Sequence, residues 1–133
     1  MGILKFKGKD KRLYELVAPL VMNPDVIRSN NNYPFKTEKE YIWYLLVEND
    51  KVEGFIPLKP TIKGYYIDNY YIHDDKAETT EKLLSTIIEE IGKSKEITAL
   101  VKKRHVKDFS NLGFISWLEM KNYTKMDYKN LEE

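Results

Sequence analysis

The chain has 133 residues, a length that predicts a single domain over residues 1–133, and its 42% hydrophobic content excludes a wholly disordered protein. Twenty-two basic and 21 acidic side chains leave a net charge of +1, so no overall field favours a nucleic-acid partner or an anionic membrane surface. Cysteine is absent, which excludes disulfides, thiolate metal sites and a cysteine nucleophile, and two histidines do not suggest a metal site. No apolar run approaches a membrane span and no signal peptide follows Met1, so we expect a soluble cytoplasmic protein with no membrane partner.

The first third of the chain predicts a strand and two helices. Residues 3–7 fit a short edge strand. Asp10 is expected to cap a helix whose apolar residues recur at helical spacing, and Pro19 to end or kink it. Residues 23–25 (Asn-Pro-Asp) predict the start of a second, short helix that ends at the asparagine run 30–32.

The middle of the chain predicts three strands. Residues 37–40 resemble a capping box for one helical turn. The apolar run 41–47 predicts a central strand, and residues 52–56 return from the polar turn 48–51 as its hairpin partner. Residues 65–72 predict a further continuous strand, which contains Asp68.

The clearest predicted helix follows this strand. Asp75 and Glu78 form a D-x-x-E capping signature, and Gly92 suits the left-handed position that ends a helix. The helix carries a stripe of apolar residues, namely Leu83, Leu84, Ile87, Ile88 and Ile91.

The C-terminal part predicts a strand at 96–101, a short helix at 106–111, and two strands at 114–120 and 123–128. The elements therefore alternate as in an α+β protein. We expect one mixed, mostly antiparallel sheet of six to seven strands with helices on both faces.

Four motifs in this order resemble the GNAT superfamily of acyl-CoA-dependent N-acyltransferases. They are the hairpin 48–56 with its Gly-Phe pair, the strand ending Tyr71-Ile72 that feeds a long helix, Asn111-Leu112-Gly113-Phe114, and the closing strand 123–128. The resemblance spans almost the whole chain. It implies a GNAT fold and transfer of an acetyl group from acetyl-CoA to a primary amine on a small molecule or a protein.

In the family, a loop of the form R/Q-x-x-G-x-G/A presents backbone N–H groups to the pyrophosphate of acetyl-CoA at a helix N-terminus. The equivalent positions here are Asp75, Glu78 and Thr80, and none of them matches. The acids place negative charge where the ligand brings its own, and a capping box would occupy the N–H donors. The loop is therefore degenerate, although Lys76 and the basic run 102–104 could compensate.

The resemblance also suggests which residues would contact the cofactor, mainly through their backbone: Tyr71, Ile72, Lys76, Thr79 and Thr80. The family's general-acid tyrosine aligns with Phe109, which has no proton to give, and neighbouring Ser110 is a poor substitute.

Two residues are candidates for the general base that would deprotonate an amine acceptor. Asp68 lies within the predicted strand, where its alternative role is that of a polar residue on the sheet face. His73 lies at the end of the same strand and could equally be structural or exposed, and His105 is expected on the surface.

Two functions remain open at this point. One is an N-acetyltransferase; the other is a catalytically inactive GNAT-like binding module that has lost CoA binding. The aromatic run 114–128 is compatible with a homodimer through the last strands and also with a monomer.

Overall fold

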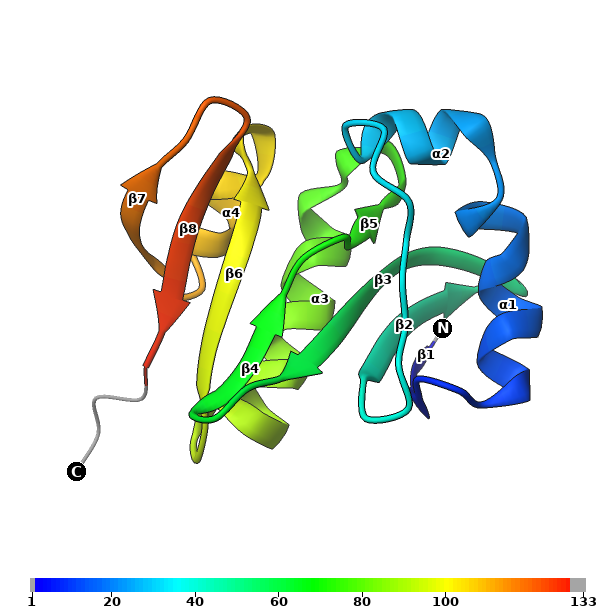
Figure 1. The fold of residues 1–133 in the computed structure, drawn as a ribbon, viewed down its shortest axis with the longest axis horizontal. Helices are drawn as coiled ribbons and strands as arrows, with labels where there is room; N and C mark the ends of the chain where they lie inside the picture. The colour runs from blue at the N-terminus through cyan, green and yellow to red at the C-terminus, as the bar shows by residue number, and fades with distance from the viewer. Residues whose placement is uncertain (1, 130–133) are drawn as a thin grey trace.

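The computed structural model describes residues 2–129, which form one eight-stranded sheet flanked by helices (Figure 1). The strands are β1 (Gly2–Lys7), β2 (Ile42–Glu48), β3 (Lys51–Pro60), β4 (Gly64–Ile67), β5 (Tyr71–Ile72), β6 (Glu96–Lys102), β7 (Ile115–Glu119) and β8 (Tyr123–Tyr128). The helices are α1 (Lys11–Val21), α2 (Pro24–Ser29), α3 (Ala77–Ile87) and α4 (Val106–Ser110), with short helical turns η1 (His73–Asp75), η2 (Ile88–Gly92) and η3 (Lys103–His105).

The sheet order is β1-β2-β3-β4-β6-β8-β7, and β5 pairs with β3 beside this path. Every pair of neighbouring strands is antiparallel except β4 and β6, which run parallel. The expected mixed, mostly antiparallel α+β sheet is therefore confirmed. It has eight strands because the strand predicted over 65–72 is divided into β4 and β5.

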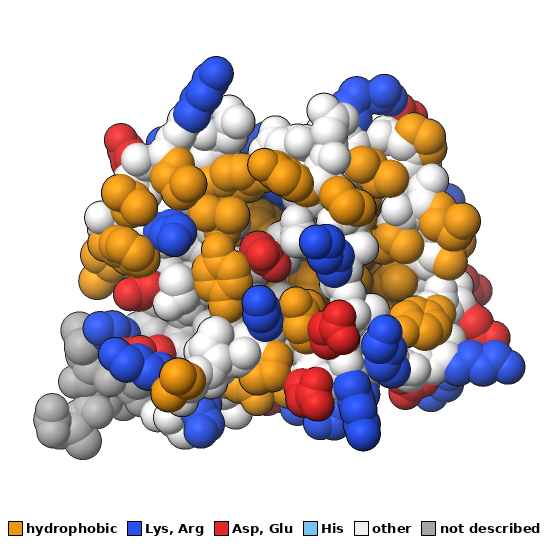
Figure 2. Space-filling view, in the orientation of Figure 1, with side chains coloured by type: hydrophobic (Ala, Val, Ile, Leu, Met, Phe, Trp, Pro, Cys, Tyr) orange, Lys and Arg blue, Asp and Glu red, His pale blue; other side chains and the backbone are white. Residues whose placement is uncertain are grey.

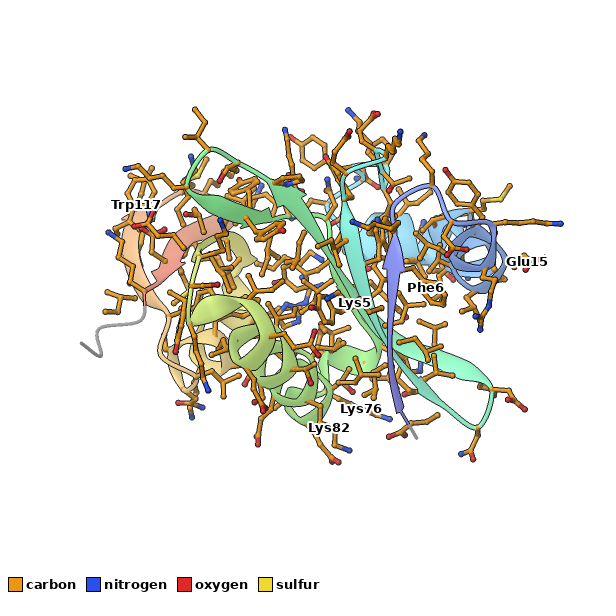
Figure 3. All side chains as sticks on the ribbon, turned by 90° about the horizontal axis from the view of Figure 1, so that it is seen from below. Lys5, Phe6, Glu15, Lys76, Lys82 and Trp117 are labelled. Atoms are coloured by element: carbon orange, nitrogen blue, oxygen red, sulfur yellow. The ribbon has the colours of Figure 1, made fainter. Side chains whose placement is uncertain are left out.

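The two faces of the sheet are covered by different helices, and each face has its own hydrophobic core. Along β2, Trp43 and Leu45 pack with residues of α1 and α2, whereas Tyr44 and Leu46 pack with residues of α3. Figure 3 shows α1 and α3 on opposite sides of the sheet. This alternation explains why the strand is apolar on both faces.

Local capping explains where the first helices begin. The Asp10 side chain accepts a hydrogen bond from the backbone of Arg12, and the Asn23 side chain accepts one from Asp25, as the sequence predicts. Pro19 does not end α1, which continues to Val21.

Two further expectations about helix ends are wrong. Residues 37–40 form no helix, because the Thr37 hydroxyl donates to the Gly8 carbonyl at 2.8 Å and accepts from the Trp43 indole at 2.9 Å. Gly92 is not in the left-handed region, and the helix continues through it as the η2 turn. Its lack of a side chain leaves room for the Tyr128 ring, which would lie 3.0 Å from an added Cβ.

Candidate functional site

The candidate site is the crevice that opens where β4 and β6 stop pairing. The two strands pair from Gly64 opposite Glu96 to Ile67 opposite Ala99. Beyond this point β5 pairs only with β3, while β6 continues to Lys102 beside β8 (Figure 1). The two strands therefore diverge after Ile67 and Ala99.

Asn69 produces the break between β4 and β5. Its backbone has φ 51°, in the left-handed region that asparagine tolerates better than most residues. Its side-chain oxygen accepts a hydrogen bond from the Asn30 amide at 2.9 Å, and that amide also donates to the Tyr33 carbonyl at 3.0 Å. The end of α2 thereby fixes the strand break.

A pocket of about 370 Å³ lies beside this break. It is lined by Tyr33, Asp68, Asn69, Leu100, Met120, Lys121, Asn122 and Tyr123. The residues come from the loop after α2, the break itself, β6 and the β7–β8 turn. Figure 2 shows hydrophobic side chains gathered across the upper half of the molecule in the view of Figure 1, above a more charged lower half.

Asp68 is the acidic group of this pocket and is half-buried. Burial raises the pKa of its carboxyl group, and the charges of Lys59 and Lys36 only partly offset that effect. It makes no hydrogen bond or ion pair with another residue in the range 2–129. This carboxylate is therefore positioned to accept a proton from a bound molecule.

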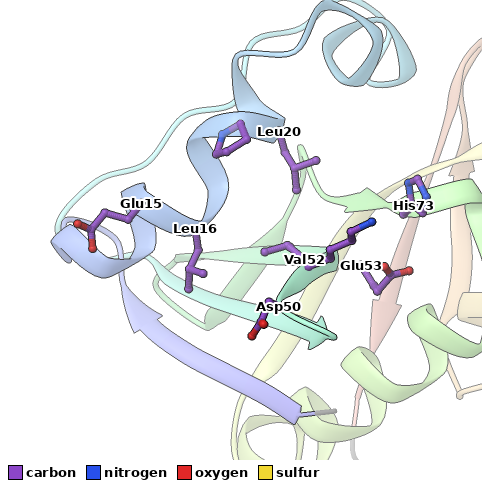
Figure 4. Close-up of a pocket in the computed structure, with 9 residues that line it drawn as sticks. Glu15, Leu16, Leu20, Asp50, Val52, Glu53 and His73 are labelled. Carbon is purple, nitrogen blue, oxygen red and sulfur yellow. The ribbon is translucent and has the colours of Figure 1, made fainter.

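His73, the other candidate base, lies in a different pocket. That pocket, of about 440 Å³, is formed between α1 and the start of β3. Figure 4 shows His73 at one end of it near Glu53, with Leu16 and Leu20 lining its helical side. His73 Nδ1 is 3.0 Å from the Tyr71 hydroxyl. The structure therefore does not bring the two candidate bases together.

The residues predicted to bind a cofactor lie around the start of α3. Tyr71 and Ile72 are buried, with their side chains in opposite cores. Thr79 and Thr80 are also buried, and their N–H groups donate to the Lys76 carbonyl at 3.1 and 3.2 Å. Their contribution to a ligand would be small, because both backbone donors are already used.

The predicted capping box at Asp75 and Glu78 does not form. The cap residue of α3 is Lys76, which makes no side-chain hydrogen bond to the first turn. Glu78 is exposed and pairs with Lys82 at 2.9 Å. The N–H groups of Ala77 and Glu78 consequently have no capping side chain and remain the natural donors for an anion.

Asp75 instead binds two basic side chains, Arg104 and His105, which follow β6 on the opposite side of the crevice. Its Oδ1 accepts from Arg104 Nε at 2.9 Å and lies 2.6 Å from His105 Nε2. Burial alone would raise the pKa of Asp75, but the hydrogen bonds from Arg104 and His105 outweigh it and lower the pKa. The negative charge of Asp75 is thus compensated locally.

The expectation that His105 lies on the surface is wrong. Within the basic run 102–105, Lys102 and His105 are buried, whereas Lys103 and Arg104 are exposed. Lys102 is 2% exposed and His105 is 1% exposed. His105 Nδ1 lies 2.7 Å from the Tyr70 hydroxyl, and Lys102 Nζ donates to the Tyr70 carbonyl at 2.6 Å. A run of charged residues at the end of a strand does not show which of its side chains are buried, so this cluster is visible only in the tertiary structure.

Phe109 is buried, as befits its place in α4, and packs against Tyr70 with ring centroids 5.6 Å apart. The general-acid position therefore carries no phenol, and Ser110 is exposed. In residues 2–129 there is no cluster of acidic and histidine side chains fit to hold a metal ion, and no helix long and apolar enough to cross a membrane.

No protein-family model and no curated protein sequence matches the chain. Solved structures do share its fold at low identity. Escherichia coli ElaA superposes with a TM-score of 0.72 at 12% identity, over 97% of this chain and 100% of that one. An acyl-CoA N-acyltransferase from Pseudomonas aeruginosa gives a TM-score of 0.70 at 11% identity, over 96% and 99%.

A third structure with this fold is the Campylobacter jejuni N-acetyltransferase PseH in complex with acetyl coenzyme A. Its TM-score is 0.61 at 14% identity, over 96% of this chain and 99% of that one. These likenesses confirm the GNAT fold that the motifs predict.

Proposed function

We propose that this chain is an N-acyltransferase that transfers the acetyl group of acetyl-CoA to a primary amine bound beside Asp68. The observation that carries the proposal is the half-buried Asp68 carboxylate, located in a pocket at the point where β4 and β6 diverge. The shared fold with solved acyltransferases supports acyl transfer as the general chemistry.

The reaction requires an amine that has lost its proton. An amine enters as a cation, which the Asp68 carboxylate attracts, and the carboxylate then accepts the proton directly or through water. The raised pKa of Asp68 makes it a better base than an ordinary exposed aspartate. The amine nitrogen attacks the thioester carbonyl carbon and the carbon–sulfur bond breaks. The departing thiolate takes up the proton that the acylated nitrogen loses, directly or through water.

Acetyl-CoA would supply the thioester, and the start of α3 fits its pyrophosphate better than the sequence suggests. The N–H groups of Ala77 and Glu78 lack a capping side chain. Lys76 lies beside them with its side chain 54% exposed, and its ammonium group is 3.6 Å from the Glu53 carboxylate. Figure 3 shows Lys76 and Lys82 along the same side of the molecule as α3. Because Arg104 and His105 compensate the charge of Asp75, this loop repels a bound anion less than the sequence suggests.

Asp68 is preferred to His73 as the base because of where each lies. Asp68 is beside the strand divergence, whereas His73 is in the pocket between α1 and β3 and contacts Tyr71. A base must be within hydrogen-bond reach of the reacting amine, which we place at the divergence.

The test measures CoA release with acetyl-CoA and a panel of primary amines, including polyamines, aminoglycosides and lysine peptides. An accepted amine should be turned over about 10²–10⁴ times more slowly by Asp68→Asn, the usual value of a general base. Asp50→Asn is the matched control, since Asp50 lies in the β2–β3 turn with φ 62°, where asparagine is equally tolerated. Equal activity of Asp68→Asn and the wild type would refute the role of Asp68.

The inactive binding module is the second candidate. It is favoured by the crevice itself, where Tyr70 and Lys102 are buried and in contact with each other. Calorimetry separates the two functions: binding of acetyl-CoA at micromolar concentration supports the enzyme. An absence of heat and of thermal stabilisation at millimolar ligand supports the module.

A further inference from the structure

Two strands that diverge leave backbone groups without partners, and buried groups of this kind need a hydrogen bond from elsewhere. Tyr70 and Lys102, on opposite lips of the crevice, supply these bonds to each other. The Lys102 backbone N–H donates to the Tyr70 hydroxyl at 3.0 Å. Lys102 Nζ in turn donates to the Tyr70 backbone carbonyl at 2.6 Å and lies 4.2 Å from the centre of the Tyr70 ring.

We propose that this reciprocal pair, here called the clasp, holds the crevice between β5 and β6 shut, and that an acyl donor can enter only when the clasp opens. The closed crevice is a property of the free protein. The identity of the ligand rests on the proposed function.

A chain of hydrogen bonds from Tyr70 through His105 and Asp75 to Arg104 supports the clasp. Because the Tyr70 hydroxyl accepts from Lys102, its own proton is free to be donated to His105 Nδ1, 2.7 Å away. His105 Nε2 then donates to Asp75 at 2.6 Å. Arg104 completes the chain, since it binds Asp75 at 2.9 Å and the Ser29 carbonyl at 3.0 Å. The clasp therefore connects both lips of the crevice to the end of α2.

The charges around Lys102 make opening dependent on pH. The pKa of Lys102 is lowered to about 7, mainly by burial and also by the charge of Arg104, while the charge of Asp75 partly offsets both. Tyr123 of β8 lies opposite Lys102, and the apolar Phe109 of α4 packs against the Tyr70 ring. Burial also lowers the pKa of His105.

The directions of these pKa shifts decide whether acid or base favours opening of the clasp. An opened, hydrated lysine has a pKa of about 10.4, so the open state binds more protons than the closed one between about pH 7 and pH 10. Acid therefore favours opening, by up to tenfold per pH unit in this range. His105 acts in the same direction, because its pKa is lower in the closed state than in water.

The first test needs no ligand and uses amide hydrogen exchange by NMR. In Tyr70→Phe, the Lys102 amide should exchange about tenfold faster relative to its intrinsic rate, while the Leu45 amide in β2 reports global stability. Lys102→Met should accelerate exchange at the edges of β5 and β6 in the same way. Lys95→Met, an exposed lysine before β6, is the matched control.

The clasp is supported if amide exchange near the crevice accelerates more than exchange at Leu45 in either variant. Because either variant is sufficient, the test remains valid if one of them fails to fold. Unchanged local exchange in the folded variants overturns it.

The second test adds acetyl-CoA to protein labelled with ¹³C at lysine Cε. In the free protein one lysine should titrate near pH 7, and saturation with acetyl-CoA should move that titration to above pH 9. Binding that leaves the titration near pH 7 overturns entry through the clasp. Binding at least fivefold tighter in Lys102→Met, but not in Lys95→Met, supports it.

The two tests separate the failure of the clasp from the failure of the proposed function. If none of the proteins binds acetyl-CoA, then the proposed function and donor entry are both overturned. The exchange experiment still decides whether Tyr70 and Lys102 hold the crevice closed.

Discussion

Asp68 and Lys102 lie on the two sides of the divergence of β4 and β6, and burial favours the neutral form of each. Burial raises the pKa of Asp68 and lowers that of Lys102 to about 7. Groups with perturbed pKa values that gather at one point of a fold are typical of functional sites. The sequence identifies Asp68 as a candidate. It does not identify Lys102 as buried.

The pH dependence of activity tests Asp68 at the scale of the residue. The carboxyl group acts as a base only when ionised, so the rate of acetyl transfer should fall as the pH drops through its raised pKa. The acidic limb should therefore lie above the ordinary aspartate value of 3.8, and it should be absent from the residual activity of Asp68→Asn. A wild-type profile without this limb between pH 4 and 8 would contradict the assignment.

The lowered pKa of Lys102 predicts how the free energy of unfolding depends on pH. Its folded pKa of about 7 is lower than the ordinary 10.5, so the unfolded chain binds more protons between these values. The free energy of unfolding should therefore rise with pH from 7 to 10, by at most about 5 kcal/mol from this group. Urea denaturation at several pH values should show this rise in the wild type and in Lys95→Met. It should be missing in Lys102→Met, and an equal rise there would disprove a buried neutral amine.

At the scale of the element, the start of α3 shows how a local pattern can mislead. Asp75 and Glu78 have the spacing of a capping box, which is worth about 1 kcal/mol. Asp75 instead binds Arg104 and His105, residues about 30 positions away that no local pattern reveals. The helix consequently begins at Ala77, and its cap residue Lys76 gives the first turn no side-chain hydrogen bond.

Gly54 determines how closely α3 packs on β3. A Cβ at this position would lie 2.9 Å from Thr79 Cγ2 and 2.9 Å from the Tyr71 carbonyl oxygen. Gly54→Ala should therefore push α3 or β5 outward and lower the free energy of unfolding by about 1–3 kcal/mol. Gly2→Ala is the control, because nothing lies within 4 Å of its added Cβ. Equal urea midpoints for the two variants would show that this close packing is unimportant.

At the scale of the whole molecule, binding of acetyl-CoA should stabilise the fold. A ligand that binds only the folded state at 100 times its dissociation constant adds about 2.7 kcal/mol. Thermal unfolding with increasing acetyl-CoA should therefore show a rising midpoint, with a larger rise in Lys102→Met if the clasp competes with the ligand. Adenosine 3′,5′-bisphosphate is the control for binding through phosphates alone. An unchanged midpoint at millimolar acetyl-CoA would favour the inactive binding module.

The last two strands give the molecule an apolar edge. Ile115, Trp117, Leu118 and Met120 are exposed on or just after β7, which ends the sheet. Figure 3 shows Trp117 at this end, far from Glu15 on α1. The homodimer expected from the aromatic run stays a prediction.

The sequence by itself determined the order of the elements, the two-faced apolar character of β2 and the caps of α1 and α2, because these depend on periodicity and on neighbours a few residues apart. The GNAT fold came from the resemblance of four motifs to a known family. It also made Asp68 a candidate base, which stays a prediction. Only the tertiary structure decided that Asn69 breaks the strand, that His73 lies apart from Asp68, and that Tyr70, Lys102, His105 and Asp75 close the crevice. These features depend on hydrogen bonds between residues about 30 to 40 positions apart. The burial that changes the pKa values there exists only once the two lips of the crevice are brought together.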